Sequence, residues 1–360
     1  MGTKVLHVID NMRLGGAQRI VSRLVENNAS HSLHVLRQTD EQMTDTENFT
    51  ITKSNWRFNI KSFLDVWRLI NREDPKIVHC HLKKSYYVGL MVKLTSIKNF
   101  KLVFHEHGEI WKNGNHEYDI MLKHASPLIN RHVAVSEHTA DLLNERGQVP
   151  KEKIETIYNF VDESKFNSEV LDKFQKDLQE EVDTDCFTIG FAGRLVERKG
   201  WKTIVSTAER LGDDFQILVS GSGKGREELK KKSLEIDNLE YVGYLEDVRS
   251  LFAAIDCFIL PSHWDPSPMI FYEVQSCGIP LICTDTSSID ELVDERENAL
   301  TFEPKNVDGL INKIKRVGSD RELRKNIVQE GLIAAANYSY NNFEENLEAL
   351  YDSITSTRTK

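Results

Sequence analysis

A chain of 360 residues with 40% hydrophobic and 28% charged side chains is long enough for two globular domains with ordinary cores. Its net charge of −10 argues against a nucleic-acid-binding protein. The sequence contains neither an apolar run of about 18 residues nor a charged-then-apolar leader, so we expect neither a transmembrane helix nor a signal peptide. The five cysteines are odd in number and form no CxxC pair, which favours a reducing compartment and disfavours a thiolate metal site.

Charge is distributed unevenly along the chain. Residues 1–160 carry a net charge of +4 and contain eleven of the twelve histidines, whereas residues 161–360 carry −14. The two halves are therefore chemically distinct, which predicts two domains with a boundary near residue 160.

The first half alternates strands and helices. The pattern predicts strands over 4–10, 77–81, 102 to about 107 and 131–135, and helices from about 17 to 27 and over 137–144, the second capped by Ser136. Gly15 and Gly16 lie between the first strand and its helix, where glycine lets the backbone approach an anion. A GxGxxG fingerprint is absent, so a nicotinamide dinucleotide is disfavoured.

Histidines follow the predicted strands at the edge of the sheet where ligands bind. His79 and His81 end one strand, and His105 and His107 end another. Histidines at this spacing bind zinc in other proteins, with Glu106 as a candidate third ligand. Polar residues at such strand ends also contact substrates, and this second interpretation is favoured while a metal site stays open as the alternative.

The second half begins with charged residues. Residues 163–186 have a low apolar density, which indicates a linker, and their Asp183-Thr-Asp185 sequence is better explained as a solvated turn than as a DxD metal site. A predicted strand over 188–192 leads to Gly193 and Arg194, with Lys199 further along the same glycine-flanked loop. Cations in such a loop can bind a phosphate. A strand over 215–219 then enters a tight glycine turn.

The region from 257 to 285 is the most informative stretch of the sequence. It predicts a short strand over 257–260, a proline-rich loop, a buried helix over 269–276 and a second strand over 281–284. Glu273 lies in the middle of the apolar helix and therefore needs a partner, and Asp265 lies in the loop before it. A diphosphate flanked by two sugars would fit this arrangement, whereas the alternative is a surface Asp and a Glu paired with a structural cation.

Taken together, the motifs resemble the retaining glycosyltransferases of family 4. The matching segments, in order, are Gly15-Gly16-Ala17, His107-Gly108, Asn159-x-Val161-Asp162, Gly193-Arg194 through Lys199-Gly200, Gly221-x-Gly223, Gly243, Asp265-x7-Glu273 and Cys277-Gly278-x-Pro280. The resemblance implies an α/β GT-B fold, with two doubly wound Rossmann-like domains facing across a cleft. It places the acceptor-side domain at 1–163, the nucleotide-sugar-binding domain at 164–337, and a C-terminal helix over 338–356 that crosses back onto the first domain.

The resemblance also implies roles for particular residues. Glu273 would bind the ribose of the nucleotide and Asp265 the hydroxyls of the donor sugar, while Arg194 and Lys199 would neutralise the diphosphate. His107 would lie against the transferred sugar. Together with Glu273, the substrate-binding positions implied are Gly15, Gly16, Gly193, Gly243, Pro268, Met269 and Ile270.

The implied activity is metal-independent and needs no cofactor. The resemblance predicts retaining transfer of a hexosyl or N-acetylhexosaminyl group from a nucleotide-diphosphate sugar, UDP favoured over GDP, to a glycan or lipid-linked acceptor in the synthesis of cell-surface polysaccharide or glycoconjugate. Two features depart from the family pattern: Asp265 replaces a glutamate, and Pro266 and Pro268 replace part of a glycine-rich loop. The alternatives are a catalytically silent nucleotide-sugar-binding protein of the same fold and a nucleotide-sugar epimerase.

A basic segment predicts contact with a membrane surface. Five lysines and no acid lie between Lys83 and Lys101, interleaved with apolar and aromatic residues. This pattern is typical of helices that lie on an anionic leaflet, although an ordinary domain helix with solvated lysines shows it too. With the resemblance, it predicts a cytoplasmic protein with weak peripheral contact at the inner face of the membrane.

Overall fold

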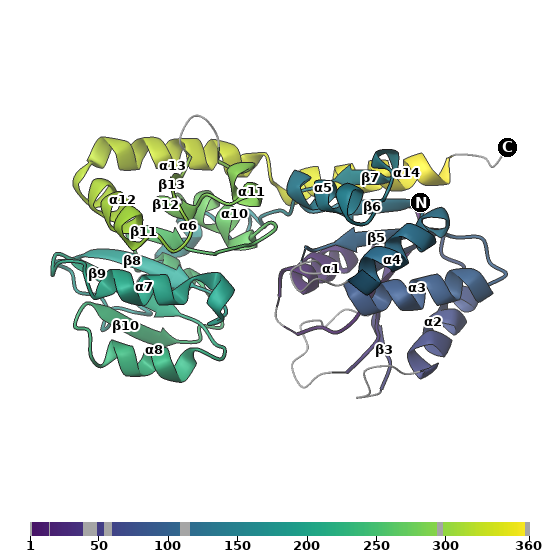
Figure 1. Cartoon of the computed structure of the whole chain (residues 1–360), viewed down its shortest axis with the longest axis horizontal. Helices are drawn as coiled ribbons and strands as arrows, with labels where there is room; N and C mark the ends of the chain where they lie inside the picture. The colour runs from purple at the N-terminus through teal and green to yellow at the C-terminus, as the bar shows by residue number, and fades with distance from the viewer. Residues whose placement is uncertain are drawn as a thin grey trace. The chain divides into compact units, whose positions relative to one another are not determined.

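The computed structural model describes residues 2–13, 15–38, 49–53, 60–108, 116–293 and 298–356. The chain divides into two compact units (Figure 1). Unit 1 comprises residues 1–159 together with 341–360, and unit 2 comprises residues 160–340. The last helix of the chain, yellow in Figure 1, therefore belongs to the same unit as the N-terminus.

Unit 1 contains a parallel sheet of seven strands in the order β3-β2-β1-β4-β5-β6-β7. These are β1 (Val5–Ile9), β2 (His31–Val35), β3 (Phe49–Ile51), β4 (Ile77–His81), β5 (Lys101–Glu106), β6 (Arg131–Ala134) and β7 (Ile154–Thr156). The strand order changes direction between β1 and β4, and the crevice at the carboxyl ends of such a pair is where ligands bind in doubly wound sheets.

Helices connect these strands and supply most of the apolar surface that covers the sheet. They are α1 (Gly16–Asn27), α2 (Ile60–Glu73), α3 (Lys83–Thr95), α4 (His116–Ala125), η1 (Ser126–Leu128), α5 (Glu137–Glu145), η2 (Lys151–Lys153) and α14 (Tyr340–Thr355). Ser136 caps α5 as predicted, because its hydroxyl accepts a hydrogen bond from the Thr139 amide at 3.2 Å.

Unit 2 contains a parallel sheet of six strands in the order β10-β9-β8-β11-β12-β13. These are β8 (Phe187–Ala192), β9 (Phe215–Ser220), β10 (Leu239–Gly243), β11 (Cys257–Leu260), β12 (Leu281–Thr284) and β13 (Leu300–Phe302). The order reverses between β8 and β11, so the loops after these two strands form the predicted ligand edge.

The helices of unit 2 pack on both faces of its sheet, around a core of aliphatic and aromatic residues. They are α6 (Ser168–Leu171), η3 (Asp172–Phe174), η4 (Glu197–Lys199), α7 (Trp201–Ala208), α8 (Arg226–Ser233), α9 (Arg249–Phe252), α10 (Met269–Ser276), α11 (Ser287–Asp290), α12 (Val307–Ser319) and α13 (Arg321–Ala336). The two parallel sheets confirm the predicted pair of Rossmann-like α/β domains. Among the described residues, no helix combines the length and the apolar character needed to cross a bilayer.

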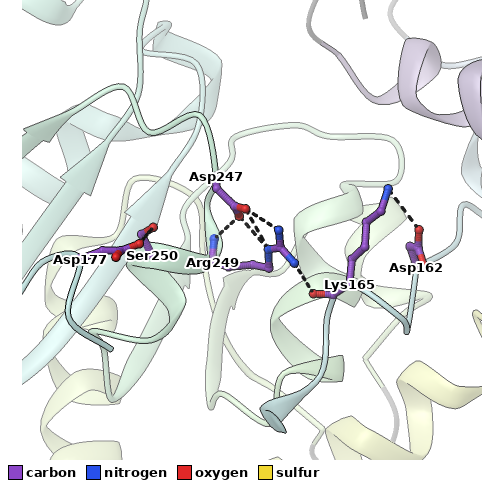
Figure 2. A network of polar contacts seen from close by, with 6 residues as sticks. All are labelled: Asp162, Lys165, Asp177, Asp247, Arg249 and Ser250. Carbon is purple, nitrogen blue, oxygen red and sulfur yellow. Dashed lines mark hydrogen bonds and ion pairs between the residues drawn. The ribbon is translucent and has the colours of Figure 1, made fainter. Parts of the chain in front are cut away.

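The segment predicted to be a linker is folded against unit 2. Figure 2 shows the polar contacts that hold it: the Arg249 guanidinium binds Asp247 and donates to the Lys165 carbonyl at 3.3 Å. In the same network, the Ser250 hydroxyl donates to Asp177 at 2.6 Å. The segment also places apolar side chains against the unit, because Leu178 is 6% exposed and the Phe166 ring lies 6.2 Å from that of Phe252.

Candidate functional site

The loop between β11 and α10 has the structure that the sequence predicted. β11 ends at Leu260, the loop passes through Asp265 and Ser267, and α10 begins after Pro268. Asp265 is 7% exposed and Ser267 is 5% exposed, so the loop is buried rather than a solvated turn. Pro268, the N-cap residue of α10, makes no side-chain capping hydrogen bond, and amides at a helix N-terminus can bind an anion.

Asp265 forms an ion pair with Lys199. The family resemblance assigned these two residues to different parts of the donor, Asp265 to the sugar and Lys199 to the diphosphate. The Lys199 ammonium donates to the Asp265 carboxylate, and the Ser288 hydroxyl donates to the Asp265 carbonyl at 2.7 Å. The backbones of the two loops are also joined, because the His263 amide donates to the Arg198 carbonyl at 2.8 Å. The structure therefore brings the loops after β8 and β11 together at the switch point of the sheet.

The close approach of these loops depends on Gly200. Its φ of +71° lies in the left-handed region, and a Cβ placed there would lie 1.9 Å from the Pro261 carbonyl oxygen. Only glycine avoids both the backbone strain and the overlap. Gly200 thus sets the distance between the lysine loop and the aspartate loop.

We therefore expect Gly200→Ala to destabilise unit 2. The left-handed conformation alone costs about 1–3 kcal/mol for a residue with a Cβ, and the overlap with Pro261 adds to this. Urea unfolding should show a loss of more than about 2 kcal/mol in the free energy of unfolding. Gly212→Ala is the control, since a Cβ at Gly212 meets nothing within 4 Å and should change stability by about 0.5 kcal/mol at most. Equal stability of the two variants would contradict the close approach.

Glu273 lies in the middle of α10 and is 3% exposed. Phe271, Tyr272 and Val274 beside it are fully buried, as the sequence predicted for this helix. Burial raises the pKa of the neighbouring Cys277 thiol to about 12, and the Glu273 carboxylate adds to that rise. The Glu273 carboxylate therefore lies close enough to Cys277 to affect the pKa of its thiol.

The other predicted residues of unit 2 follow neighbouring strands. Gly193 and Arg194 come directly after β8, and the Arg194 side chain is exposed. Gly243 ends β10 with a φ of +81°, and a Cβ there would have open space around it. Its carbonyl accepts from the Gly221 amide at 2.9 Å, which joins the ends of β9 and β10. Met269 and Ile270 are half-buried in the first turn of α10.

In unit 1, sequence reasoning missed a residue at the switch point between β1 and β4. The Asp10 carboxylate, at the end of β1, accepts from the Ser85 amide at 2.8 Å and the Lys84 amide at 3.3 Å. It thereby caps α3, whose own N-cap residue Leu82 provides no side-chain bond. Burial raises the pKa of Asp10 to about 6, against the effect of these amides. The signal in the sequence that could have identified Asp10 was an acid directly after the first strand. Gly15 and Gly16 begin α1 after the same strand.

The prediction that the strand-end histidines line a ligand crevice was wrong for three of them. His79, His81 and His105 are fully buried within β4 and β5. His79 Nδ1 lies 2.6 Å from the Tyr351 hydroxyl of α14, which covers this face of the sheet. His107, after the end of β5, is only half-buried. Burial lowers the pKa of each of these rings, to about 3 for His107.

Among the residues that the structure describes, two groups of histidines have ligand nitrogens within 4.8 Å of one another. They are His7, His79 and His81, and His81, His105 and His107. Glu106 is in neither group, because residues 105 and 107 point to the opposite side of the strand. The Tyr118 hydroxyl donates to Glu106 instead, and burial raises the pKa of Glu106 to about 8.

Comparison with protein families gives two matches in chain order. Residues 14–165 match the family described as Glycosyltransferase Family 4, and residues 172–332 match Glycosyl transferases group 1. The chain is 25% identical to the UDP-Gal:alpha-D-GlcNAc-diphosphoundecaprenol alpha-1,3-galactosyltransferase of Escherichia coli, over 74% of this chain and 72% of that protein. It is 23% identical to an uncharacterized 41.2 kDa protein in the cps region of Klebsiella pneumoniae, over 81% of this chain and 83% of that one.

Solved structures give the same fold. Anabaena Alr3699/HepE in complex with UDP superposes with a TM-score of 0.84 at 16% identity, covering 98% of this chain and all (100%) of that chain. A glycosyltransferase from Rickettsia africae superposes with a TM-score of 0.83 at 18% identity, covering 99% of this chain and 100% of that chain.

Proposed function

The chain belongs to the group 1 glycosyltransferases and has their GT-B fold. We therefore propose that it transfers the sugar of a UDP-sugar to a lipid-linked glycan, with retention of configuration and without a metal ion. Members of the family transfer sugars from nucleotide-sugar donors in the synthesis of polysaccharides or glycoconjugates. The acceptor is inferred from relatives such as the Escherichia coli enzyme, whose printed name includes a diphosphoundecaprenol acceptor.

The observation that carries the proposal is the buried pair of acids around the start of α10. Asp265 and Glu273 are 7% and 3% exposed; Asp265 precedes the N-terminus of the helix and Glu273 lies in its second turn. A nucleotide sugar has a diphosphate between two polyhydroxylated rings, so one carboxylate can bind each ring while the helix amides face the diphosphate. We assign Glu273 to the ribose and Asp265 to the donor sugar. Pro268, Met269 and Ile270 form the turn between them.

The cations are assigned to the leaving group. Bond cleavage at the sugar places growing negative charge on the diphosphate, and fixed cations stabilise that charge more in the transition state than in the ground state. Lys199 and Arg194 supply them from the loop after β8. The contact of Lys199 with Asp265 supports a second task, in which the ammonium also orients the carboxylate that we assign to the donor sugar. Gly193 and Gly243 let the nucleotide approach the backbone.

Nucleotide preference is tested by thermal shift. The panel is UDP, GDP, ADP and their sugars, and a ligand at about a hundred times its dissociation constant should stabilise the protein by about 2.7 kcal/mol. We expect UDP and UDP-sugars to give the largest rise in melting temperature. UDP is favoured because it is the nucleotide in the Anabaena complex and in the name of the Escherichia coli relative. A larger rise with GDP-sugars would contradict the choice of base and leave the transferase assignment intact.

The proposal includes weak peripheral contact of a cytoplasmic protein with the inner face of the membrane, through α3. Three apolar side chains in the last turns of α3 and just after it, which we call the α3 apolar edge, are exposed: Met91 at 49%, Leu94 at 69% and Ile97 at 94%. Lys93 and Lys98 adjoin them in sequence, although the Lys93 ammonium binds the Phe100 carbonyl and lies over its ring, and the Lys98 ammonium pairs with Asp74. Exposed apolar residues beside cations are the combination that anionic leaflets bind.

We expect the double variant Leu94→Ser and Ile97→Ser to lower binding to anionic vesicles about tenfold, because it removes apolar surface that would enter the interface. Co-sedimentation with phosphatidylglycerol vesicles at low and high salt measures the effect. Leu234→Ser is the matched control, since Leu234 is 84% exposed on unit 2. Donor hydrolysis should be unchanged in all variants. The membrane contact is contradicted if the parent protein does not sediment with the vesicles at low salt, or if Leu234→Ser binds them as weakly as the double variant. An acceptor that is free in solution then becomes the better assignment.

A further inference from the structure

Four imidazole rings form a continuous chain across the sheet of unit 1. The members of this histidine chain are His107, His81, His7 and His31. They follow or belong to β5, β4, β1 and β2, which are neighbours in that order within the sheet. The chain therefore leads from the carboxyl edge of the sheet, where His107 is half-buried, into the interior of the unit.

All three links of the histidine chain have the same polarity. His107 Nε2 lies 3.2 Å from His81 Nδ1. His81 Nε2 lies 3.0 Å from His7 Nδ1, and His7 Nε2 lies 3.2 Å from His31 Nδ1. A neutral imidazole has one N–H and one lone pair, and each N–H must face a lone pair. Neutral rings in this chain must therefore all carry the proton on Nε2, or all carry it on Nδ1.

Burial keeps His7, His81 and His107 in the neutral form. It lowers the pKa values of His7 and His81 well below the usual histidine value, with neighbouring histidines adding to the effect, and it lowers that of His107 to about 3. A protonated ring would break the alternation of donors and acceptors. Near neutral pH the choice between the two tautomers is thus made at the ends of the chain.

The inner end of the chain meets a carboxylate. Glu348 of α14 has its Oε1 atom 3.2 Å from His31 Nε2. Within the described part of the chain this nitrogen has no aligned hydrogen-bond partner, so the contact is electrostatic. A carboxylate attracts an N–H and repels a lone pair at that distance. Glu348 therefore favours the Nε2–H form of His31, and the polarity of the chain passes the same form on to each ring.

We propose that Glu348 sets the ring tautomer of His107 through the histidine chain, leaving Nδ1 of His107 as an acceptor for a sugar hydroxyl. Glu348 and the three inner histidines act through His107 and are positioning residues. The contact with the sugar rests on the proposed function, whereas the tautomer itself does not. No proton moves in this arrangement, because the chain only orients the N–H and the lone pair of the ring that faces the substrate.

A bound metal is the competing explanation of the same histidines. His7, His79 and His81 have ligand nitrogens within 4.8 Å of one another. His79 Nε2 is fully buried and has no hydrogen-bond partner among the described residues. A metal at this position would take lone pairs from His7 and His81 and interrupt the chain between them. Metal content therefore decides between the two explanations.

The tautomer is measured by nitrogen NMR of the full chain with 15N-labelled histidine, at about pH 8, above the usual histidine pKa. A His107→Gln variant assigns the His107 signals. We expect a protonated Nε2 and an unprotonated Nδ1 at His107 in the parent protein. In Glu348→Lys an ammonium, which can only donate, replaces the carboxylate, so the proton should move to Nδ1 of His107. Sugar transfer should fall about ten- to a hundredfold, as is typical when a group that orients a functional side chain is lost.

Glu345→Lys is the matched control, because Glu345 is exposed on the same helix, three residues before Glu348. It should leave both the tautomer and the transfer rate unchanged. A protonated Nδ1 of His107 in the parent protein overturns the proposal, and so does a tautomer that does not respond to Glu348→Lys. Stoichiometric zinc in the purified protein also overturns it. If Glu348→Lys does not fold, the parent spectrum and the metal analysis still decide. If the tautomers are as expected but the protein transfers no sugar, the proposed function is refuted and the inference about the tautomer stands.

Discussion

Glu273→Ala is expected to lose most of its affinity for the nucleotide-sugar donor and to keep its fold. A carboxylate that binds two ribose hydroxyls makes hydrogen bonds worth about 1.5–3 kcal/mol each, because the acceptor is charged. Losing even one of them raises the dissociation constant about tenfold to a hundredfold. Isothermal titration calorimetry with a UDP-sugar measures the loss, and the thermal midpoint without ligand reports on the fold.

Two further variants separate a ligand contact from a structural one at this position. Glu273→Gln keeps the shape and one acceptor oxygen of the side chain but replaces the other oxygen with an NH2 donor, so it should retain part of the affinity. Glu227→Ala, at a side chain that is 86% exposed on α8, should bind like the parent. If Glu273→Ala unfolds, or binds the nucleotide as tightly as the parent, the buried carboxylate serves the protein rather than the ribose.

Lys199→Ala and Arg194→Ala should each lower turnover on the order of a hundredfold or more. Both cations are assigned to the leaving diphosphate, where charge develops as the sugar bond breaks. Steady-state release of nucleoside diphosphate measures the effect. Added magnesium should restore little activity, and the parent should remain active in EDTA, because the proposal assigns stabilisation of the diphosphate charge to the protein's own cations.

The loss of Lys199 also leaves the buried Asp265 carboxylate without this ion-pair partner, which can destabilise the loop. Thermal midpoints of the variants are therefore needed beside the rates. Lys202→Ala is the matched control, because Lys202 lies one turn further along, is 60% exposed and pairs with Glu228 on the surface. A comparable loss of turnover in Lys202→Ala, or loss of parent activity in EDTA, would refute the assignment of the cations to the leaving group.

Local patterns in the sequence were sufficient to predict the strands and helix around Asp265. The strands over 257–260 and 281–284 and the helix over 269–276 were predicted with the bounds that the structure has. Short apolar runs bounded by prolines and glycine determine these elements with little help from the rest of the chain. The burial of Glu273 followed from the same apolar helix.

The surroundings of the histidines could not be predicted in this way. His79 lies 272 residues from Tyr351, the residue that covers it, and His31 lies far in sequence from Glu348. A strand pattern shows that two histidines share a face, but not which helix packs on that face. The pairing of Lys199 with Asp265, 66 residues apart, was hidden for the same reason.

The central claim, that the chain transfers a sugar from a nucleotide sugar, is tested most directly by following the donor and the product together. The purified protein is incubated with UDP-sugars and a short lipid-diphosphate-linked glycan, and proton and phosphorus NMR record UDP release and the anomeric form of the new linkage. The account predicts UDP release in step with a new glycosidic bond that keeps the donor's anomeric configuration. Donor binding without release would indicate a silent binding protein, interconversion of the free donor would indicate an epimerase, and an inverted linkage would contradict the retaining mechanism.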